Sequence, residues 1–272
     1  MSKIRFQQVA GYFYPSNPDK LHNDIETMMN KVQLFEKYDK IFGLVSPHAG
    51  YIYSGSTAAY AYYTLIDKNI KTVYVISPSH YEYFPGVSIY DGDAYQTPLG
   101  EIEIDQEKAD ELTKNSKIIF RGIQGHRKEH ALEVQLPFLQ YVLKDFKLVP
   151  IVMGDQADLY VNELSEKLAS VVDENSIVVA SSDLSHFYSA AVANELDGLV
   201  EKRINEFDYE NLQKDLNHKK CEACGGGTIV ALLKTAAMKN YNRAKVLKRT
   251  DSGDVTGDKS EVVGYLSAVV YS

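Results

Sequence analysis

The sequence lacks the features that mark membrane and secreted proteins. No apolar run approaches the roughly 18 to 20 residues that a membrane span needs. The first residues, "MSKIRFQQVA", have no apolar core of the kind found in signal peptides. The chain has only two cysteines, Cys221 and Cys224, and without a secretion signal this pair favours metal or redox chemistry over a structural disulfide. We therefore expect a cytoplasmic protein with no membrane partner.

Basic character is lacking as well. The formal net charge is -8, from 29 Lys and Arg against 37 Asp and Glu. Binding to nucleic acid needs a basic patch for the phosphates, and the sequence contains none. The composition, 44% hydrophobic and 24% charged, is ordinary for a globular protein. At 272 residues the chain fits one α/β domain with a large core, so we predict a single domain over residues 1–272.

Apolar periodicity predicts strands that alternate with helices. Five runs are rich in Val, Ile and Tyr and have the length of buried strands. These predicted strands are 41–46, 72–77, 147–153, 176–182 and 262–271. Six segments carry apolar residues at helical spacing, namely 18–38, 56–67, 129–143, 159–173, 190–207 and 227–239. Such alternation predicts an α/β fold in which helices cover both faces of a mostly parallel sheet, with the active cleft outside the carboxyl ends of the strands.

Two histidines follow two of these strands in the same way. His48 lies in "SPHAGY" after one strand, and His80 lies in "SPSHY" after the next. A lone histidine at such a place is usually a surface or core residue. Here, however, a proline shortly before each histidine ends the strand and fixes the direction of the loop. Two imidazoles presented from equivalent, stiff positions are typical of metal ligands.

A third candidate ligand is Cys224 in "CEACGGGTIVALL". Three glycines follow it and open a helix, where backbone N–H groups and the helix dipole favour a thiolate. The alternatives are a small buried residue next to a tight glycine turn, a redox dithiol formed by Cys221 and Cys224, or a zinc site formed by both cysteines with the two histidines.

The segment "SSDLSHFY" places Asp183 and His186 one helical turn apart, just after a predicted strand. An aspartate beside a histidine can orient it and favour its protonated form, which suits a general acid or base. The alternative is a helix start in which Asp183 is the N-cap and His186 is exposed.

The roles of two further polar segments stay open. In "GHRKEHALEVQL", His130 and Glu133 lie one turn apart and can support a ligand, whereas Glu129 and Lys128 resemble a solvated helix start and His126 has no assigned role. Near the C-terminus, oxygen-bearing side chains recur in "SGDVTGDKSEVVGY" but do not match a complete calcium loop. We predict a structured loop that leads to the last strand, from which Asp254 can still reach the cleft.

Seven motifs in order resemble one family. They are "VAGYFYPSNPDKL", "SPHAGYIYSG", "SPSHY", "EHALEVQLPFL", "SSDLSH", "ACGGG" and "SGDVTGDKSEVVGY". This order resembles that of the Memo-like proteins, known in prokaryotes as the AmmeMemoRadiSam system protein B group, from about Val9 to Tyr265. Memo-like proteins are similar in fold to the class III extradiol dioxygenases, which are non-haem iron enzymes. The resemblance implies a three-layer α/β/α sandwich with a mostly parallel or mixed central sheet.

The resemblance also implies a site. One metal ion would be held by His48, His80 and Cys224, with Asp183 and His186 lining the same cleft and His186 in the place of an acid/base histidine. The dioxygenases use two histidines and a carboxylate, so the thiolate here takes the position of the carboxylate. Fe(II) is the expected ion, and Cu or Zn also suits a thiolate.

Two functions follow from this resemblance. The first is a non-haem, metal-dependent oxidoreductase, dioxygenase-like, that acts on an unidentified small molecule. The second is a non-enzymatic metal- or peptide-binding adaptor, because eukaryotic Memo-like proteins are linked to signalling and to phosphotyrosine peptides. The lack of an evident arginine cluster weighs against phosphate binding. The prokaryotic family name implies association with radical-SAM and AMMECR-type partner proteins.

Overall fold

Four β-branched runs form the centre of the main sheet. The protein is described by a computed structural model that covers residues 3–272. The central strands, in spatial order, are β2 (Ile41–Ser46), β9 (Ser176–Ser181), β3 (Thr72–Pro78) and β8 (Lys147–Met153). They are all parallel and almost wholly buried, as strands with helices on both faces must be. Each lies within one residue of its predicted bounds.

Antiparallel strands extend this centre, so the nine-stranded sheet is mixed. β12 (Val262–Tyr271) runs antiparallel to β2 and also pairs with β10 (His186–Tyr188) and β11 (Arg243–Asp251). On the other side, β4 (Val87–Tyr90) is antiparallel to β8 and parallel to β7 (Ile119–Gly122). The sequence pattern did not predict β11, because its "RAKVLKRTD" carries several exposed charged residues and has no continuous apolar run.

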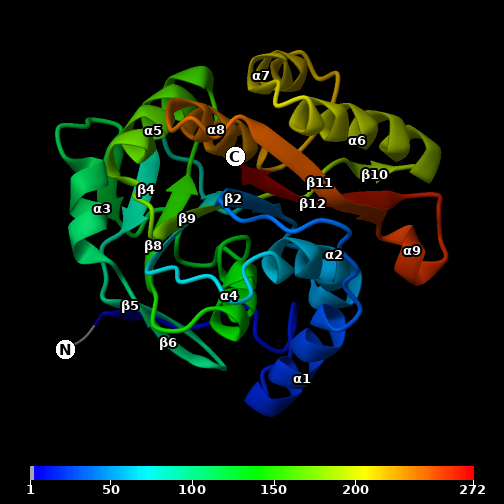
Figure 1. The fold of residues 1–272 in the computed structure, drawn as a ribbon, viewed down its shortest axis with the longest axis horizontal. Coiled ribbons are helices and arrows are strands. Elements are labelled where there is room, and N and C mark those ends of the chain that lie inside the picture. The colour runs from blue at the N-terminus through cyan, green and yellow to red at the C-terminus, as the bar shows by residue number, and fades with distance from the viewer. Residues whose placement is uncertain (1–2) are drawn as a thin grey trace.

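Helices cover both faces of the sheet and make three layers (Figure 1). One face is covered by α1 (Pro18–Met29), α2 (Tyr51–Tyr63) and α4 (Leu136–Val142). The other face is covered by α3 (Gln106–Thr113), α5 (Asp158–Val171), α6 (Ala190–Asn205), α7 (Tyr209–Asn217) and α8 (Gly226–Met238). Alternate residues of β3 belong to opposite cores: Val73 and Val75 pack with the first group, and Tyr74 and Ile76 with the second. The predicted α/β sandwich is confirmed.

Smaller elements complete the chain. A three-stranded sheet contains β1 (Ile4–Arg5), β5 (Ala94–Thr97) and β6 (Gly100–Glu103). A 3-10 turn, η1 (Glu133–Gln135), precedes α4, and the short helix α9 (Gly253–Thr256) connects β11 to β12. Within residues 3–272, no helix is both long enough and apolar enough to cross a membrane.

Two helix predictions are too long. The segment 18–38 is helical only as far as Met29, with Asn30 as the C-cap, and Phe35 beyond it is 99% exposed. The segment 129–143 contains only η1 and α4. Pro137 lies at the start of α4, where its missing N–H costs nothing, and the residues before η1 form an irregular segment that reaches the candidate site.

Candidate metal centre

The carboxyl ends of three adjacent strands carry the site. Because β9 lies between β2 and β3, the loops that follow these three strands emerge side by side. The loop after β2 carries His48, the loop after β3 carries His80, and the loop after β9 carries Asp183. This is the edge of a parallel sheet where α/β proteins place their ligands.

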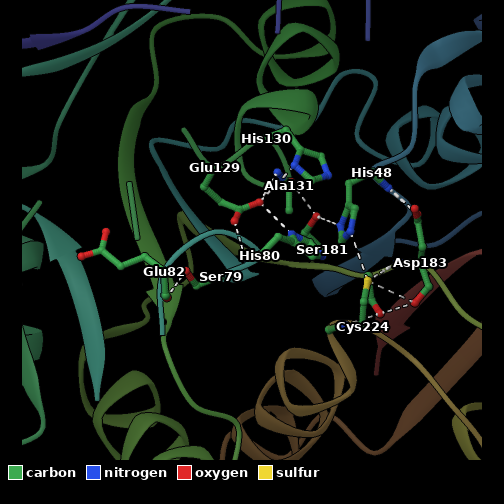
Figure 2. Close-up of polar contacts among 12 residues, drawn as sticks. His48, Ser79, His80, Glu82, Glu129, His130, Ala131, Ser181, Asp183 and Cys224 are labelled. Atoms are coloured by element: carbon green, nitrogen blue, oxygen red, sulfur yellow. Dashed lines mark hydrogen bonds and ion pairs between the residues drawn. The ribbon is translucent and has the colours of Figure 1, made fainter. Parts of the chain in front are cut away.

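His48, His80 and Cys224 converge at this edge. Each offers a ligand atom, and the three atoms lie within 4.8 Å of one another. Cys224 Sγ is 3.1 Å from His48 Nε2, although 176 positions separate the two residues in the chain. The rings of His48 and His80 are 5.1 Å apart and nearly perpendicular. The structure thus brings together the three predicted ligand residues (Figure 2).

The other ring nitrogen of each histidine is held by the protein. His48 Nδ1 is 2.9 Å from Ser181 Oγ, whose own proton goes to the carbonyl of Ala131, so His48 Nδ1 carries the hydrogen and its Nε2 is an acceptor that faces the Cys224 sulfur. His80 Nδ1 is 2.8 Å from Glu129 Oε1. Burial, with a contribution from the charge of His80, lowers the pKa of His48 well below its ordinary value and keeps the ring neutral, the form that binds metal. This arrangement fits a metal centre.

Cys224 is half-buried at the start of a helix. The helix that follows begins at Gly226, one residue before its predicted start, and Sγ accepts a hydrogen bond from the backbone N–H of Asp183 at 3.2 Å. Burial raises the pKa of the Cys224 thiol, and the nearby Asp183 charge raises it further. Burial thus opposes the thiolate that the helix start is expected to favour. A cation beside the sulfur would reverse this balance.

Asp183 and His186 do not lie on one turn of a helix. Asp183 is buried in an irregular loop, where its Oδ1 accepts a hydrogen bond of 2.7 Å from the backbone N–H of His48. Burial raises the pKa of the Asp183 carboxyl. His186 opens β10, and its Nδ1 bonds the carbonyl of Leu184 at 2.8 Å, so Asp183 positions His48 instead of pairing with the His186 ring. The N-cap alternative is also wrong, because no helix begins at Asp183.

His186 nevertheless lies at the same cleft as the sulfur. His186 and Cys224 both line a pocket of about 440 Å³ between the loop after β9 and the start of α8. A molecule in this pocket can meet the imidazole and the candidate metal centre together. The predicted position of His186 beside the site is compatible with a proton-transfer role, which stays a prediction.

Glu129 is the site residue that the sequence pattern missed. Its sequence context resembles a solvated helix start, yet its side chain is buried and holds His80 twice, through the backbone N–H at 2.5 Å and through Nδ1. Burial acts to raise the pKa of Glu129, but the hydrogen bonds and charge of His80 outweigh it and lower the value to about 2. His80, Glu129 and His130 form a second group of atoms within 4.8 Å. Because Glu129 already accepts these bonds, the group supports His80 and is not a separate ion site.

Glu133 has a different role from the one predicted. Its spacing from His130 predicts that the two residues support a ligand together. In the structure its carboxylate instead binds Arg5 and the hydroxyl of Tyr14. His130 instead lies against His80, with the ring centroids 4.8 Å apart. Burial lowers the pKa of His130 to about 4, so this imidazole is neutral at pH 7.

Other titratable candidates lie away from the ligand cluster. Cys221 is buried and belongs to no group of metal-ligating atoms in residues 3–272, and it forms no disulfide with Cys224. His126 is buried between Tyr95 and the carbonyl of Ser88. Asp254 lies in α9 and pairs with Lys259, and it belongs to neither group of ligand atoms.

The fold and these side chains define an α/β sandwich whose strand ends gather two imidazoles and a thiol. Residues 5–269 match the sequence model of the Memo-like protein family. A MEMO1 family protein of Methanocaldococcus jannaschii is 38% identical over 287 residues, covering 99% of this chain and all of the relative. MEMO1 family proteins of Thermoplasma volcanium and Sulfurisphaera tokodaii are also 38% identical, over 98% and 97% of this chain and 98% of each relative. The chain belongs to the Memo-like family.

Proposed function

We propose that His48, His80 and Cys224 hold one metal ion. One observation carries this proposal. The protein binds Nδ1 of each imidazole, through Ser181 for His48 and through Glu129 for His80, and this leaves Nε2 for an ion beside the sulfur. Fe(II) is the ion we favour, because two imidazoles and one carboxylate are the common protein ligands of non-haem iron and the thiolate here stands in the place of the carboxylate. Cu and Zn are the alternatives that a thiolate also suits.

We further propose a metal-dependent, dioxygenase-like oxidoreductase that acts on a small molecule. The ion would supply redox chemistry, and the chain would supply binding and proton transfer. The pocket beside Cys224 has room for a small substrate, and His186 on its wall is placed to move a proton. Asp183 fixes the loop that carries His48, so it acts as a positioning residue.

Metal analysis and oxygen consumption test this proposal. Protein purified without added metal should contain about one Fe per chain, and the Fe(II)-loaded protein should consume oxygen with at least one compound from a broad substrate set. His186→Ala should slow turnover at least about 100-fold and retain the metal, as expected for loss of a general acid or base. The matched control His218→Ala removes an exposed histidine at the end of α7. Zinc bound without any redox turnover would contradict the oxidoreductase.

An adaptor is the second candidate, and exposed aromatic side chains near the cleft favour it. Tyr81 is 61% exposed, and its ring lies 5.8 Å from that of His130. Phe187, the residue that follows His186, is 71% exposed. Exposed aromatic residues are common in binding surfaces. An adaptor that uses the cleft should bind its peptide more weakly in the His48→Ala and Cys224→Ser variants. Peptide binding that these variants do not change would count against it.

A further inference from the structure

The short loop between β8 and α5 reaches two segments that carry candidate ligands. One segment is the loop that contains His80. From that loop, the hydroxyl of Tyr83 donates a hydrogen bond of 3.0 Å to Asp155 Oδ2. The other segment contains Cys224, and Gln156 contacts it. No residue of the β8–α5 loop belongs to either group of ligand atoms in residues 3–272, so the loop acts on the centre by holding these segments.

Gln156 binds the backbone of the Cys224 segment at two points. Its Nε2 donates to the carbonyl of Cys224 at 2.8 Å, and its Oε1 accepts the backbone N–H of Gly227 at 2.7 Å. A carbonyl only accepts and a backbone N–H only donates, so the two partners fix the orientation of the amide. A carboxylate at this position has no donor and could not bind both groups.

The third glycine of "CEACGGG" makes room for this side chain. A Cβ atom added at Gly227 would lie 2.8 Å from Cβ of Gln156 and 3.0 Å from its Oε1, which is closer than such atoms approach in proteins. Glycine is a poor helix former, yet Gly227 lies in the first turn of α8. The close approach of Gln156 explains why this helical position has no side chain.

The backbone of Cys224 is held on its other side by Asp183. The Cys224 N–H donates to the carbonyl of Asp183 at 3.2 Å, and the Cys224 carbonyl accepts from Gln156. Both peptide groups that flank the Cys224 side chain therefore have a fixed partner. Two fixed peptide groups fix the direction of the side chain between them, and Sγ lies 3.1 Å from His48 Nε2.

We propose that Gln156 is a positioning residue of the metal centre, which holds the Cys224 backbone so that the sulfur faces the two imidazoles. This inference rests on the proposed metal centre and adds to it the structure that sets the place of the sulfur. Because the β8–α5 loop is also bound to the loop of His80, it joins the segments of two ligands.

Co(II)-loaded protein tests this role, because a thiolate bound to Co(II) gives a sulfur-to-cobalt absorption band. Gln156→Leu removes both hydrogen bonds and keeps a side chain of similar size. Its Co(II) affinity should fall about tenfold, the usual effect of losing the support of a metal ligand. Its absorption band should weaken or shift, because the sulfur is no longer held in place. Gln156→Ala should give the same changes.

Gln213→Leu is the matched control, since Gln213 lines the same pocket but bonds Asn217 instead of the Cys224 segment. Its Co(II) affinity should stay within about twofold of that of the wild type, with the same band. Urea denaturation of the metal-free proteins separates positioning from folding, and both Gln156 variants should still unfold cooperatively.

Wild-type Co(II) affinity and an unchanged band in both Gln156 variants would overturn the inference. If these variants were also less stable in urea, Gln156 would serve the fold and not the ion. A wild-type protein that binds Co(II) without the sulfur-to-cobalt band would refute the metal centre itself, and the inference with it.

Discussion

Two buried carboxylates hold the two candidate histidine ligands through the same kind of contact. Glu129 accepts the backbone N–H of His80, and Asp183 accepts the backbone N–H of His48. Glu129 also binds the imidazole of His80, whereas Ser181 does so for His48. Each imidazole is thus fixed both at the backbone and at the ring, which is the support that metal ligands need.

Glu129→Gln should weaken metal binding about 10- to 100-fold, the usual effect of losing such a support. The amide cannot accept the His80 ring hydrogen and the two backbone hydrogen bonds with the same charge and geometry. Competition with a coloured chelator measures the affinity. Glu174→Gln, at an exposed position, is the matched control. Unchanged affinity in Glu129→Gln would show that His80 does not depend on this carboxylate.

His126 gives the protein a sensitivity to acid that is independent of the metal. Burial lowers its pKa to about 3, whereas in the unfolded chain it titrates near 6.5. Because the unfolded state binds the proton first, stability falls as the pH drops below about 6.5, by about 1.4 kcal/mol per pH unit until the folded pKa is reached. His126→Gln keeps a donor for Ser88 and an acceptor for Tyr95 but does not titrate.

The free energy of unfolding of the wild type should therefore fall about 2 kcal/mol more than that of His126→Gln between pH 6.5 and pH 5. Urea denaturation at both pH values measures the difference, and the other titrating groups cancel between the two proteins. Parallel pH profiles would mean that His126 is not kept neutral by the fold.

The individual candidate ligands stand out in the sequence because local signals surround them. His48 and His80 each follow a β-branched run and a proline, and Cys224 precedes a glycine run. Glu129 could not be found in this way, since "HRKEHALEV" is as charged as any solvated helix start. Its burial depends on where the irregular segment before η1 lies in three dimensions, which no local pattern encodes.

At the scale of elements, one buried ion pair fastens the N-terminal strand β1 to the segment that carries Glu129. Arg5 binds the carboxylate of Glu133 and the backbone carbonyls of His126 and Glu129. Glu133 also accepts the hydroxyl of Tyr14 and two backbone N–H groups. Both charged groups are almost fully buried, so either one alone would be an uncompensated charge.

Arg5→Leu should therefore cost about 3–5 kcal/mol of unfolding free energy, because it leaves Glu133 buried without its counter-charge. It should also loosen the Glu129 segment and weaken metal binding. Chemical denaturation gives the first effect and a chelator competition gives the second. Replacing both partners, as Arg5→Leu with Glu133→Leu, should recover part of the stability. A loss below about 1 kcal/mol in Arg5→Leu would be that of a surface pair and would contradict this account.

Elements with continuous apolar runs were predictable, and elements at the edges were not. The central strands are buried on both faces and need no polar residues, so their runs stand out in the sequence. β11 is an edge strand with exposed Lys and Arg, which protects an edge from aggregation and also hides it from an apolar pattern. The helix predicted to reach residue 38 ends at Met29, and Val32 and Tyr38 beyond it pack on the same core from a non-helical segment.

At the scale of the whole molecule, the candidate centre connects distant parts of the chain. Its residues come from the loop between β2 and α2, from the loop after β3 and from the segment before α8, and α2 and α8 cover opposite faces of the sheet (Figure 1). An ion bound there would add cross-links that the metal-free chain lacks. A ligand that binds only the folded state stabilises it by about 4 kcal/mol when present at 1,000 times its Kd.

Removal of the metal should therefore lower the Tm by several degrees, since each kcal/mol corresponds to about 2 °C for a chain of this size. Cys224→Ser should lose most of the difference between the metal-loaded and metal-free Tm. Cys221→Ala should keep that difference, because Cys221 is buried apart from the ligand atoms and its loss affects only packing. Differential scanning calorimetry with and without a chelator measures both variants. If Cys221→Ala abolished the metal-dependent increase as Cys224→Ser does, both sulfurs would bind the ion, and the centre would be a structural zinc site.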